Sequence, residues 1–468
     1  MSHPADSPKP AYEPATPNSR SLAVGLLVLA LPIIASMISR TVMSWVDFAM
    51  VSSLGPAAQA AIVPASIGLF CLIALGFGIT SAVSTLVSQA LGRGEHRRCG
   101  AYAWQGAWIG VAWGGLTLLL WPFVPGIVGA FGHSPDVAAM EADYITIGLL
   151  GIGPAVIAAA WTNFFTGIHQ PWAGFWATLI ANVFNIFANW VLIYGNLGAP
   201  ALGVAGAAWA TSAAAAVSVL VLFGFMAAPK LRREFGTFHG LLPKPTLLRP
   251  LLRIGLPAGL QLVGDIATFA VFLFLLIGRF GTTAMAGSNI AFKFFELAIM
   301  PCVGVAFACA AAVGKSIGQA DLELARRQAY TAWRINLAWV AAVAIIYVTA
   351  GGWLVTLLTD DPEVAAVAWS VLLCMAVFQL FDATQFTFAN ALRGAGDTLV
   401  PAVIMLVGTA GVMLAGGWLV AVYAPGFGVI GPWWMAVAAF ALIACLYALR
   451  FRSGVWERID INRDRSPR

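Results

Sequence analysis

The sequence predicts an all-α, polytopic membrane protein with about 12 transmembrane helices in two pseudo-symmetric bundles of six. Three observations predict this fold class: an excess of apolar residues, their grouping into long segments, and a repeat of the first half of the chain by the second. Of the 468 residues, 60% are hydrophobic and only 10% are charged. Soluble globular domains carry about 25% charged residues, so the composition excludes an ordinary soluble protein.

Apolar segments long enough to cross a bilayer, which takes about 20 residues, recur along the whole chain. We expect helices at residues 22–50, 57–88, 102–130, 138–166, 172–195, 202–228, 251–278, 283–314, 329–358, 364–391, 399–423 and 428–450. Residues 1–20 contain five prolines and lack the pattern of a cleaved signal peptide. They are therefore predicted to be a disordered tail.

The basic residues predict the orientation of the chain. Most of the 25 Lys and Arg residues lie in segments that fall on one side of the predicted helices, whereas the opposite loops contain only Arg279. Arg393, which follows the predicted tenth helix, is counted among the loop residues of the basic side. By the positive-inside rule, both termini lie in the cytoplasm and the protein spans the bacterial cytoplasmic (inner) membrane many times. This placement accounts for the net charge of +5, so nucleic acid is not an expected partner.

The second half of the chain repeats the first at an offset of about 226 residues. Gly55 corresponds to Gly281 and Gly92 to Gly318, and S-P-D-V-A-A at 134–139 corresponds to D-P-E-V-A-A at 361–366. The repeat predicts an N-terminal lobe over 21–228, a cytoplasmic linker over 229–250, a C-terminal lobe over 251–452 and a cytoplasmic tail over 453–468. Parallel repeats of this kind enclose a substrate cavity between the lobes, near the middle of the membrane.

Four acidic residues fall inside the predicted helices, where a charge costs about 2.5 to 3.5 kcal/mol on insertion scales. They are Asp47, Asp265, Glu296 and Asp382. Glu296 is three residues from Lys293, so the two are expected to neutralise each other on one helix. The other three are candidates for binding a coupling ion, H⁺ or Na⁺.

Amide side chains accompany these acids. Asn182, Asn185 and Asn189 have the spacing of one face of a helix, Gln261 is one turn from Asp265, and Gln379 and Gln385 flank Asp382. Asn182, the three glutamines and Arg40 are candidates to line the cavity. The alternative is that these polar groups only join neighbouring helices by hydrogen bonds. Arg40 is either a counter-ion for an acid such as Asp47 or a side chain that extends towards the membrane surface.

Motifs of enzymes are absent from the sequence or occur in the wrong context. G-F-G-V-I-G at 426–431 fits a dinucleotide-binding pattern, but no strand precedes it. No metal-ligand spacing and no nucleophile motif occurs, so neither an enzyme nor a cofactor other than the coupling ion is predicted.

Several motifs resemble those of the multidrug and toxic compound extrusion (MATE) family, in its bacterial branch. They are V-D-F-A-M-V at 46–51, the asparagine helix followed by G-V-A-G at 203–206, and F-D-A-T-Q-F-T-F-A-N-A-L-R-G-A-G-D-T at 381–398. The resemblance implies that Asp47, Asn185 and Asn189 form a proton or Na⁺ site in the N-terminal lobe. It makes Asp382 and Asp265 the corresponding acids of the C-terminal lobe.

The expected function is that of a secondary antiporter that exports amphipathic organic cations in exchange for H⁺ or Na⁺ and works as a monomer in the lipid bilayer. One alternative is a flippase for a lipid-linked saccharide, which requires several cations in the cavity. Another is a non-transporting channel or scaffold, in which neutral substitutions of the acids would not abolish function.

Overall fold

The computed structural model describes residues 19–459, and within that range it is helical with no strand. Twelve helical segments there are long and apolar enough to cross a membrane, which confirms the predicted fold class. The long helices are α1 (Ser19–Ser52), α2 (Pro56–Gly92), α3 (His96–Leu118), α5 (Pro135–Gly167), α6 (Trp172–Tyr194), α7 (Val204–Ala227), α9 (Pro245–Val271), α10 (Thr282–Gly318), α11 (Leu322–Thr356), α12 (Pro362–Ala395) and α15 (Ile430–Arg452). The remaining span combines α13 (Leu399–Val407), a π-helix (Gly408–Gly416) and α14 (Gly417–Tyr423).

Some helices begin earlier than the apolar pattern predicts, because polar residues continue them beyond the hydrocarbon region. Helix α3 begins at His96 rather than near 102, and α11 begins at Leu322 rather than near 329. The side chain of Asp321 caps α11 by accepting a hydrogen bond from the backbone nitrogen of Leu324 at 2.8 Å. An apolar window does not detect such a polar first turn.

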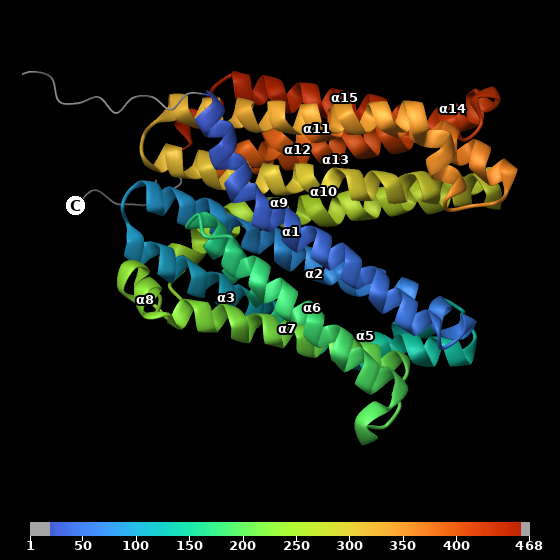
Figure 1. Cartoon of the computed structure of the whole chain (residues 1–468), viewed down its shortest axis with the longest axis horizontal. Helices are drawn as coiled ribbons and strands as arrows, with labels where there is room; N and C mark the ends of the chain where they lie inside the picture. The colour runs from blue at the N-terminus through green and yellow to red at the C-terminus, as the bar shows by residue number, and fades with distance from the viewer. Residues whose placement is uncertain (1–18, 460–468) are drawn as a thin grey trace, which may run out of the picture.

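The helices form two bundles that are joined near the two ends of the described chain and diverge away from them (Figure 1). Helices α2 to α7 make up most of the N-terminal lobe, and α10 to α15 make up most of the C-terminal lobe. Each lobe has its own buried core, with Trp161 and Phe164 in the first and Trp433 and Tyr447 in the second. We call the side on which the described chain begins and ends the chain-end side.

Helices α1 and α9 each belong to both lobes. Leu26 and Leu29, in the first half of α1, are buried in the core of the C-terminal lobe, whereas Val51 at its end lies in an N-terminal core. Conversely, Leu251 and Ile254 in the first half of α9 are buried in the N-terminal core. In Figure 1, α1 runs obliquely from one bundle to the other. The packing of the two lobes therefore exchanges the first halves of their first helices, which the sequence boundaries do not indicate.

The contacts between the lobes are made by residues that the sequence repeat relates to each other. Gly92 lies against its repeat partner Gly318, and a Cβ added at Gly92 would come within 2.8 Å of the Cα of Gly318. Gly78 of α2 lies against Gly259 of α9, and the equivalent Gly304 of α10 lies against Ile34 of α1. Glycine is needed here because only a residue without a side chain allows two backbones to approach so closely.

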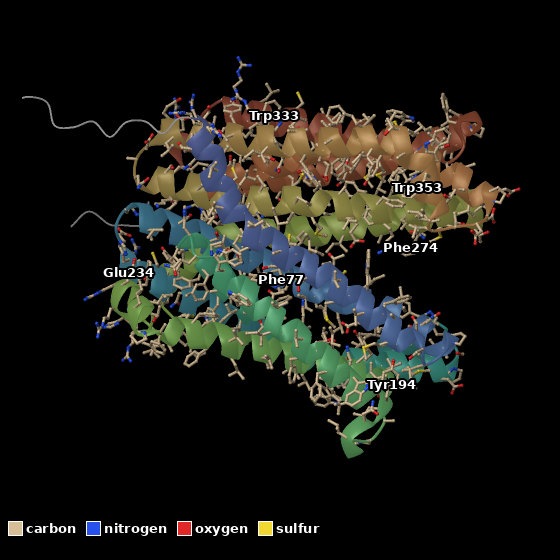
Figure 2. All side chains as sticks on the ribbon, viewed as in Figure 1. Phe77, Tyr194, Glu234, Phe274, Trp333 and Trp353 are labelled. Atoms are coloured by element: carbon tan, nitrogen blue, oxygen red, sulfur yellow. The ribbon has the colours of Figure 1, made fainter. Side chains whose placement is uncertain are left out.

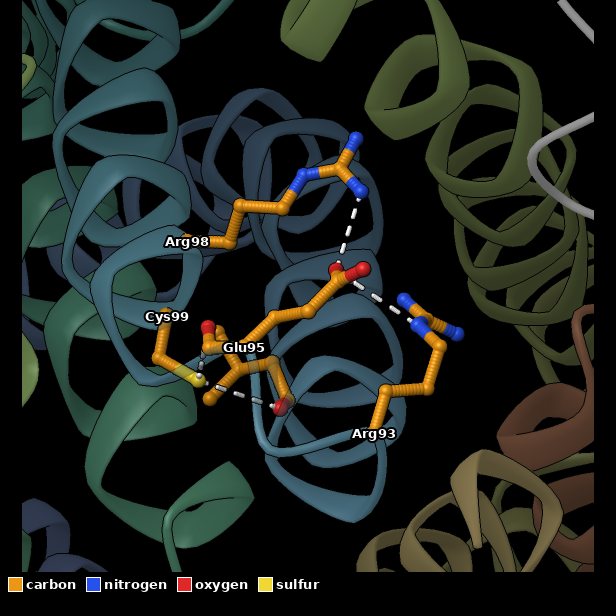
Figure 3. A network of polar contacts seen from close by, with 5 residues as sticks. Arg93, Glu95, Arg98 and Cys99 are labelled. Carbon is orange, nitrogen blue, oxygen red and sulfur yellow. Dashed lines mark hydrogen bonds and ion pairs between the residues drawn. The ribbon is translucent and has the colours of Figure 1, made fainter. Parts of the chain in front are cut away.

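The turn between α2 and α3 is held by a polar network on the chain-end side (Figure 3). Glu95 forms ion pairs with Arg93 at 3.5 Å and with Arg98 at 2.9 Å. The thiol of Cys99 donates weak hydrogen bonds to the backbone oxygens of Val87 and Glu95, at 3.6 and 3.7 Å. The network lies beside the end of α2, where Gly92 contacts Gly318 of α10.

The stretch predicted as a linker, 229–250, is largely structured. It contains the short helix α8 (Pro229–Phe235) and the beginning of α9. Phe235 is buried, and Trp104 of α3 donates a hydrogen bond from its indole nitrogen to the backbone oxygen of Thr237.

The chain ends are only partly described. Ser19 and Arg20, which were assigned to the N-terminal tail, already belong to α1. In the predicted C-terminal tail, Trp456 is buried and stacks on Phe451 with ring centroids 5.0 Å apart. Residues 1–18 and 460–468 of the two tails lie outside the described residues.

Candidate functional site

Hydrogen bonds and close packing join the two lobes on the chain-end side. The hydroxyl of Thr85 in α2 donates to the backbone oxygen of Arg393 in α12 at 3.0 Å. One turn further along α2, Gln89 donates to the backbone oxygen of Gly394, also at 3.0 Å. Together with the glycine contact at the ends of α2 and α10, these bonds form what we call the chain-end seal.

Next to this seal lies a cavity of about 290 Å³ that both lobes line, as the repeat predicts. Its walls come from α1, α2, α5, α6, α9, α10 and α12. Its apolar lining includes the aromatic side chains of Phe77, Phe307 and Phe386. Figure 2 shows Phe77 at the junction of the two bundles. Of the predicted site residues, the cavity is lined by Arg40, Gln261, Asp265 and Gln385.

A separate polar cluster lies inside the N-terminal lobe, between α1 and α6. Its members are Asp47, Asn185 and Asn189, as the resemblance implies. The amide nitrogen of Asn189 donates to a carboxylate oxygen of Asp47 and to Oδ1 of Asn185, the second bond at 2.9 Å. Both asparagines are buried, and Oδ1 of Asn189 has no hydrogen-bond partner among the described residues. The cluster therefore combines a carboxylate with an amide oxygen that is free to bind a cation.

Asn182 and Arg40 do not join this cluster. Asn182 donates to the hydroxyl and to the backbone oxygen of Ser39, at 2.8 and 3.0 Å, so it joins α6 to α1. Among the described residues, Arg40 has no ion pair with Asp47 and instead lines the cavity. Asn182 thus has the packing role that the sequence left open.

The acids of the C-terminal lobe lie at the cavity or beside it. Asp382 is 6% exposed and accepts a hydrogen bond from Gln385 at 3.0 Å. Asp265 lines the cavity, and its Oδ1 has no hydrogen-bond partner in the described part of the chain. Gln379 is not among the lining residues, and it donates to the backbone oxygen of Val340 at 3.3 Å. The structure therefore brings Asp265 and Gln385 together at one surface and leaves Gln379 in the packed core.

Arg393 is a site residue that the sequence reasoning missed. Counting it as a loop charge was wrong, because α12 continues to Ala395 and Arg393 lines the cavity. Its Nη1 donates to Oδ1 of Asn390 at 3.3 Å. A helical signal was present, because Gln385, Ala389 and Arg393 are spaced four residues apart and all line the cavity.

Lys293 and Glu296 form the predicted ion pair on α10. Nζ of Lys293 lies 3.1 Å from Oε2 of Glu296. Neither residue is among those that line the cavity.

Two pseudo-symmetric helical lobes that together line a cavity are the architecture of a secondary transporter with parallel repeats. The chain belongs to the MatE family, because the family model matches residues 32–191 and 266–419, about two thirds of its length. This match confirms the resemblance to the MATE family.

Relatives and solved structures support this assignment. The chain is 29% identical over 432 residues to a probable multidrug resistance protein NorM of Rhizobium meliloti, covering 91% of this chain and 92% of that protein. It is 27% identical to the multidrug resistance protein MdtK of Photorhabdus laumondii, over 80% and 82% of the two chains. A crystal structure of MATE in complex with MaL6 has the same fold, with a TM-score of 0.85, 21% identity and coverage of 94% of this chain and 98% of that one.

Proposed function

We propose that the protein is a secondary antiporter that exports amphipathic organic cations and other drugs in exchange for H⁺ or Na⁺. The observation that supports this most directly is a cavity that both lobes line, with Asp265 in its wall, whose Oδ1 has no hydrogen-bond partner among the described residues. Aromatic rings and an acid are the groups that bind flat cations. Alternating access then requires the seal to open while the lobes close on the other side.

The orientation follows from the positive-inside rule. The chain-end side is the cytoplasmic side in this proposal, because the basic loops belong to it. The present arrangement, with the chain-end seal formed, is then an outward-facing state. Drug release into the external medium and entry of the coupling ion take place from it.

The Asp47 cluster is the proposed entry point of the ion. When Asp47 takes up H⁺ or Na⁺, its hydrogen bond with Asn189 must weaken or rearrange, which changes the contact of α1 with α6. The first half of α1 is packed in the other lobe, around Leu26 and Leu29. A change at Asp47 therefore biases the angle between the lobes, provided that the ion binds the two states with different affinity.

We further propose that one chain is the complete transport unit. Both lobes of a single chain line the cavity, and all members of the Asp47 cluster come from α1 and α6 of that chain. No residue from a second copy is needed to complete either site.

The test is transport of a fluorescent organic cation by proteoliposomes under separately imposed pH and Na⁺ gradients. Asp47→Asn keeps the size of the side chain and removes its charge. Asn182→Ala is the matched control, since it lies on the same face of α6 but bonds only to Ser39. We expect one gradient to drive transport in the wild type and in the control but not in Asp47→Asn. A folded wild-type protein that moves nothing under either gradient would overturn the proposal and favour a lipid-linked saccharide flippase.

A further inference from the structure

The chain between the two lobes is held along the side of α3. Residues 236–244, which we call the connector, follow α8 and contain no helix. Gln105 of α3 is buried and bonds to the connector twice. Its Nε2 donates to the backbone oxygen of Leu242 at 3.2 Å, and its Oε1 accepts from the backbone nitrogen of Lys244 at 2.8 Å. The connector is therefore a fixed part of the N-terminal lobe.

Two tryptophans of the same helix place the connector at the membrane interface. The indole nitrogen of Trp104 donates to the backbone oxygen of Thr237. That of Trp108 donates to the backbone oxygen of Leu241 at 2.7 Å. Both tryptophans lie in the first two turns of the apolar part of α3, which begins near residue 102. Tryptophan is enriched at this depth, and irregular backbone there needs hydrogen-bond partners within the protein. Helix α8, which leads into the connector, lies beside α3 on the chain-end side (Figure 1).

Apolar side chains of the connector face outward. Leu241 is 41% exposed and Leu242 is 72% exposed, and Trp108 beside them is 38% exposed. Exposed apolar groups that lie together in water favour aggregation, whereas at the depth of the interface they contact acyl chains. The outer surface of the connector is therefore suited to contact with lipid.

The same part of the chain is strongly basic. Residues 229–253 contain six basic residues and one acid, Glu234. The basic residues are Lys230, Arg232, Arg233, Lys244, Arg249 and Arg253. The three basic side chains of α8 are all exposed. Positive charges next to a membrane surface attract the phosphates of anionic lipids.

Arg232 is the basic side chain that the structure holds against an apolar surface. Its guanidinium carbon lies 5.4 Å from the centroid of the Phe238 ring. Phe238 packs on Phe223, with ring centroids 5.8 Å apart, and Phe223 is itself exposed. Arg232 forms no hydrogen bond and no ion pair with any described residue. Its N–H donors are thus available to a phosphate beside the surface that acyl chains contact.

The corresponding end of the C-terminal lobe is built differently. After α15 the chain turns back into the lobe, where Trp456 is buried. Glu457 accepts a hydrogen bond from Nε of Arg326 at 2.7 Å, so this arginine already has an acidic partner. Arg452, in the last turn of α15, is exposed but has no aromatic ring beneath it among the described residues. The combination of an unpaired guanidinium and an outward apolar surface belongs to the N-terminal lobe.

We propose that α8 and the connector form a binding site for an anionic phospholipid of the leaflet on the chain-end side. Arg232 binds the phosphate, because a guanidinium matches the geometry of two phosphate oxygens. The acyl chains lie against Leu241, Leu242 and Phe223, which favours a lipid over a soluble phosphate. None of these residues lines the cavity, so the inference does not depend on the proposed transport function.

The test measures lipid selectivity at this position. In the full-length protein, after replacement of the native cysteines, a bimane fluorophore is attached at His239→Cys, an exposed position of the connector. This parent protein is placed in phosphatidylcholine bilayers. Increasing fractions of phosphatidylglycerol or phosphatidylcholine, each carrying the same nitroxide-labelled acyl chain, quench the bimane when they lie next to it. The variants are Arg232→Gln and Arg232→Glu. Arg452→Gln is the matched control, because it removes the same charge from an exposed arginine on the same side of the membrane.

We expect phosphatidylglycerol to reach half-maximal quenching at a fraction about fivefold lower than phosphatidylcholine, in the parent protein and in Arg452→Gln. This is the scale of one basic residue at a membrane surface. Arg232→Gln should bring the two lipids to the same fraction, and Arg232→Glu should make phosphatidylglycerol the weaker quencher, at the melting temperature of the parent protein. Equal quenching by both lipids in the parent protein would overturn the inference. Equal losses of selectivity in Arg232→Gln and Arg452→Gln would also overturn it, since they indicate an effect of overall surface charge.

A further arm separates a lipid from a soluble phosphate. Millimolar glycerol 3-phosphate should leave the quenching by phosphatidylglycerol unchanged. If it lowers that quenching to the level of phosphatidylcholine, the site binds the phosphate group alone and the lipid assignment is wrong. No ion gradient is imposed in these measurements, so their failure would leave the transport proposal as it stands, and a protein that transports nothing could still show the lipid selectivity.

Discussion

The two lobes have the same backbone plan but different polar interiors. Their glycine contacts are related by the repeat, yet its offset of about 226 residues places Leu273 opposite Asp47 and Val156 opposite Asp382. In the N-terminal lobe, the acid is engaged by buried amides away from the cavity. In the C-terminal lobe, Asp265 lines the cavity. Duplication thus supplied the scaffold, and each lobe carries its own chemistry.

Under the proposed function, this difference predicts a division of labour between the acids, in which Asp47 binds the ion and Asp265 contacts the drug. The division makes the acids of the two lobes unequal under substitution, although symmetry alone would make them alike. The first predictions below test that asymmetry, and the later ones test how the two lobes are held together.

The largest effect is expected from comparing Asp47→Asn with Asp265→Asn. Asp47→Asn should abolish gradient-driven transport while changing the affinity for an organic cation by less than about threefold, because Asp47 does not line the cavity. Asp265→Asn should weaken binding of the same cation by about tenfold or more, since it removes the cavity's acid. Equilibrium binding of rhodamine 123, paired with transport in proteoliposomes, separates the two effects. Equal losses of affinity in both variants would contradict the division of labour.

Enlarging a glycine in the chain-end seal should be the next most damaging change. A Cβ at Gly92 would lie 2.1 Å from the backbone oxygen of Lys315, so Gly92→Val cannot form the seal as it stands. We expect a loss of transport of about tenfold or more and a larger population of the state in which the seal is open. The added side chain would meet backbone atoms of α10, which cannot move aside easily. Gly115→Val is the control, since nothing lies within 4 Å of a Cβ added there.

The seal can be followed by the distance between spin labels placed at Arg97→Cys and Gln319→Cys, after replacement of the native cysteines. Gly92→Val should lengthen that distance, and Gly115→Val should leave it unchanged. Unchanged distances in Gly92→Val, with the protein folded, would show that the close approach of α2 and α10 does not form the seal.

A smaller effect is expected from replacing the asparagines of α6 one at a time. Asn189→Ala removes the amide that donates to Asp47, and Asn182→Ala removes one that joins α6 to Ser39. We expect Asn189→Ala to change the apparent affinity for the coupling ion by about fivefold, which is the scale of one hydrogen bond to a charged group. Asn182→Ala should change it by less than about twofold. Ion titrations of transport rate measure both, and similar shifts would remove the distinction between site and packing residues.

Much of this architecture is predictable from the sequence, because it depends on the mean hydropathy of long segments and on a repeat that spans the whole chain. The apolar segments and the repeat specify twelve spans and two lobes, and the spacing of Asn185 and Asn189 places them on one helical face. The exchange of the first halves of α1 and α9 is not predictable in this way. It depends on which core Leu26 and Leu251 enter, and both cores consist of buried apolar side chains.

The candidate site was predictable to a smaller extent. Acids inside spans were found because a charge in hydrocarbon is rare, but Arg393 was assigned to a loop because charged residues near a helix end usually lie at the membrane surface. Asn182 and Gln379 are amide side chains inside predicted helices, just as Asn185, Asn189 and Gln385 are, so the sequence does not distinguish them. Only the direction of each side chain distinguishes a cavity residue from one that packs between helices.

The smallest predicted effect concerns His169, which follows α5 on the chain-end side. Its Nε2 lies 3.3 Å from the backbone oxygen of Ala311 in α10, so it joins the two lobes by donating a hydrogen bond. Burial, together with the nearby charge of Lys315, lowers the pKa of His169 to about 4, whereas its ordinary value is 6.5. The sealed state therefore favours the neutral imidazole. Its contribution to the seal is fully present above pH 6.5 and is lost as the pH falls towards 4.

At pH 6 the seal should consequently be about fourfold less favoured relative to the open state than at pH 8, if His169 recovers its ordinary pKa on opening. His169→Asn should remove this pH dependence, because asparagine does not titrate and tolerates the left-handed backbone at this position, where φ is 61°. The spin-label distance between positions 97 and 319, measured from pH 8 to pH 5, provides the readout. An identical pH response in His169→Asn would place the titrating group elsewhere, in the acids of the cavity rather than in the contact between the lobes.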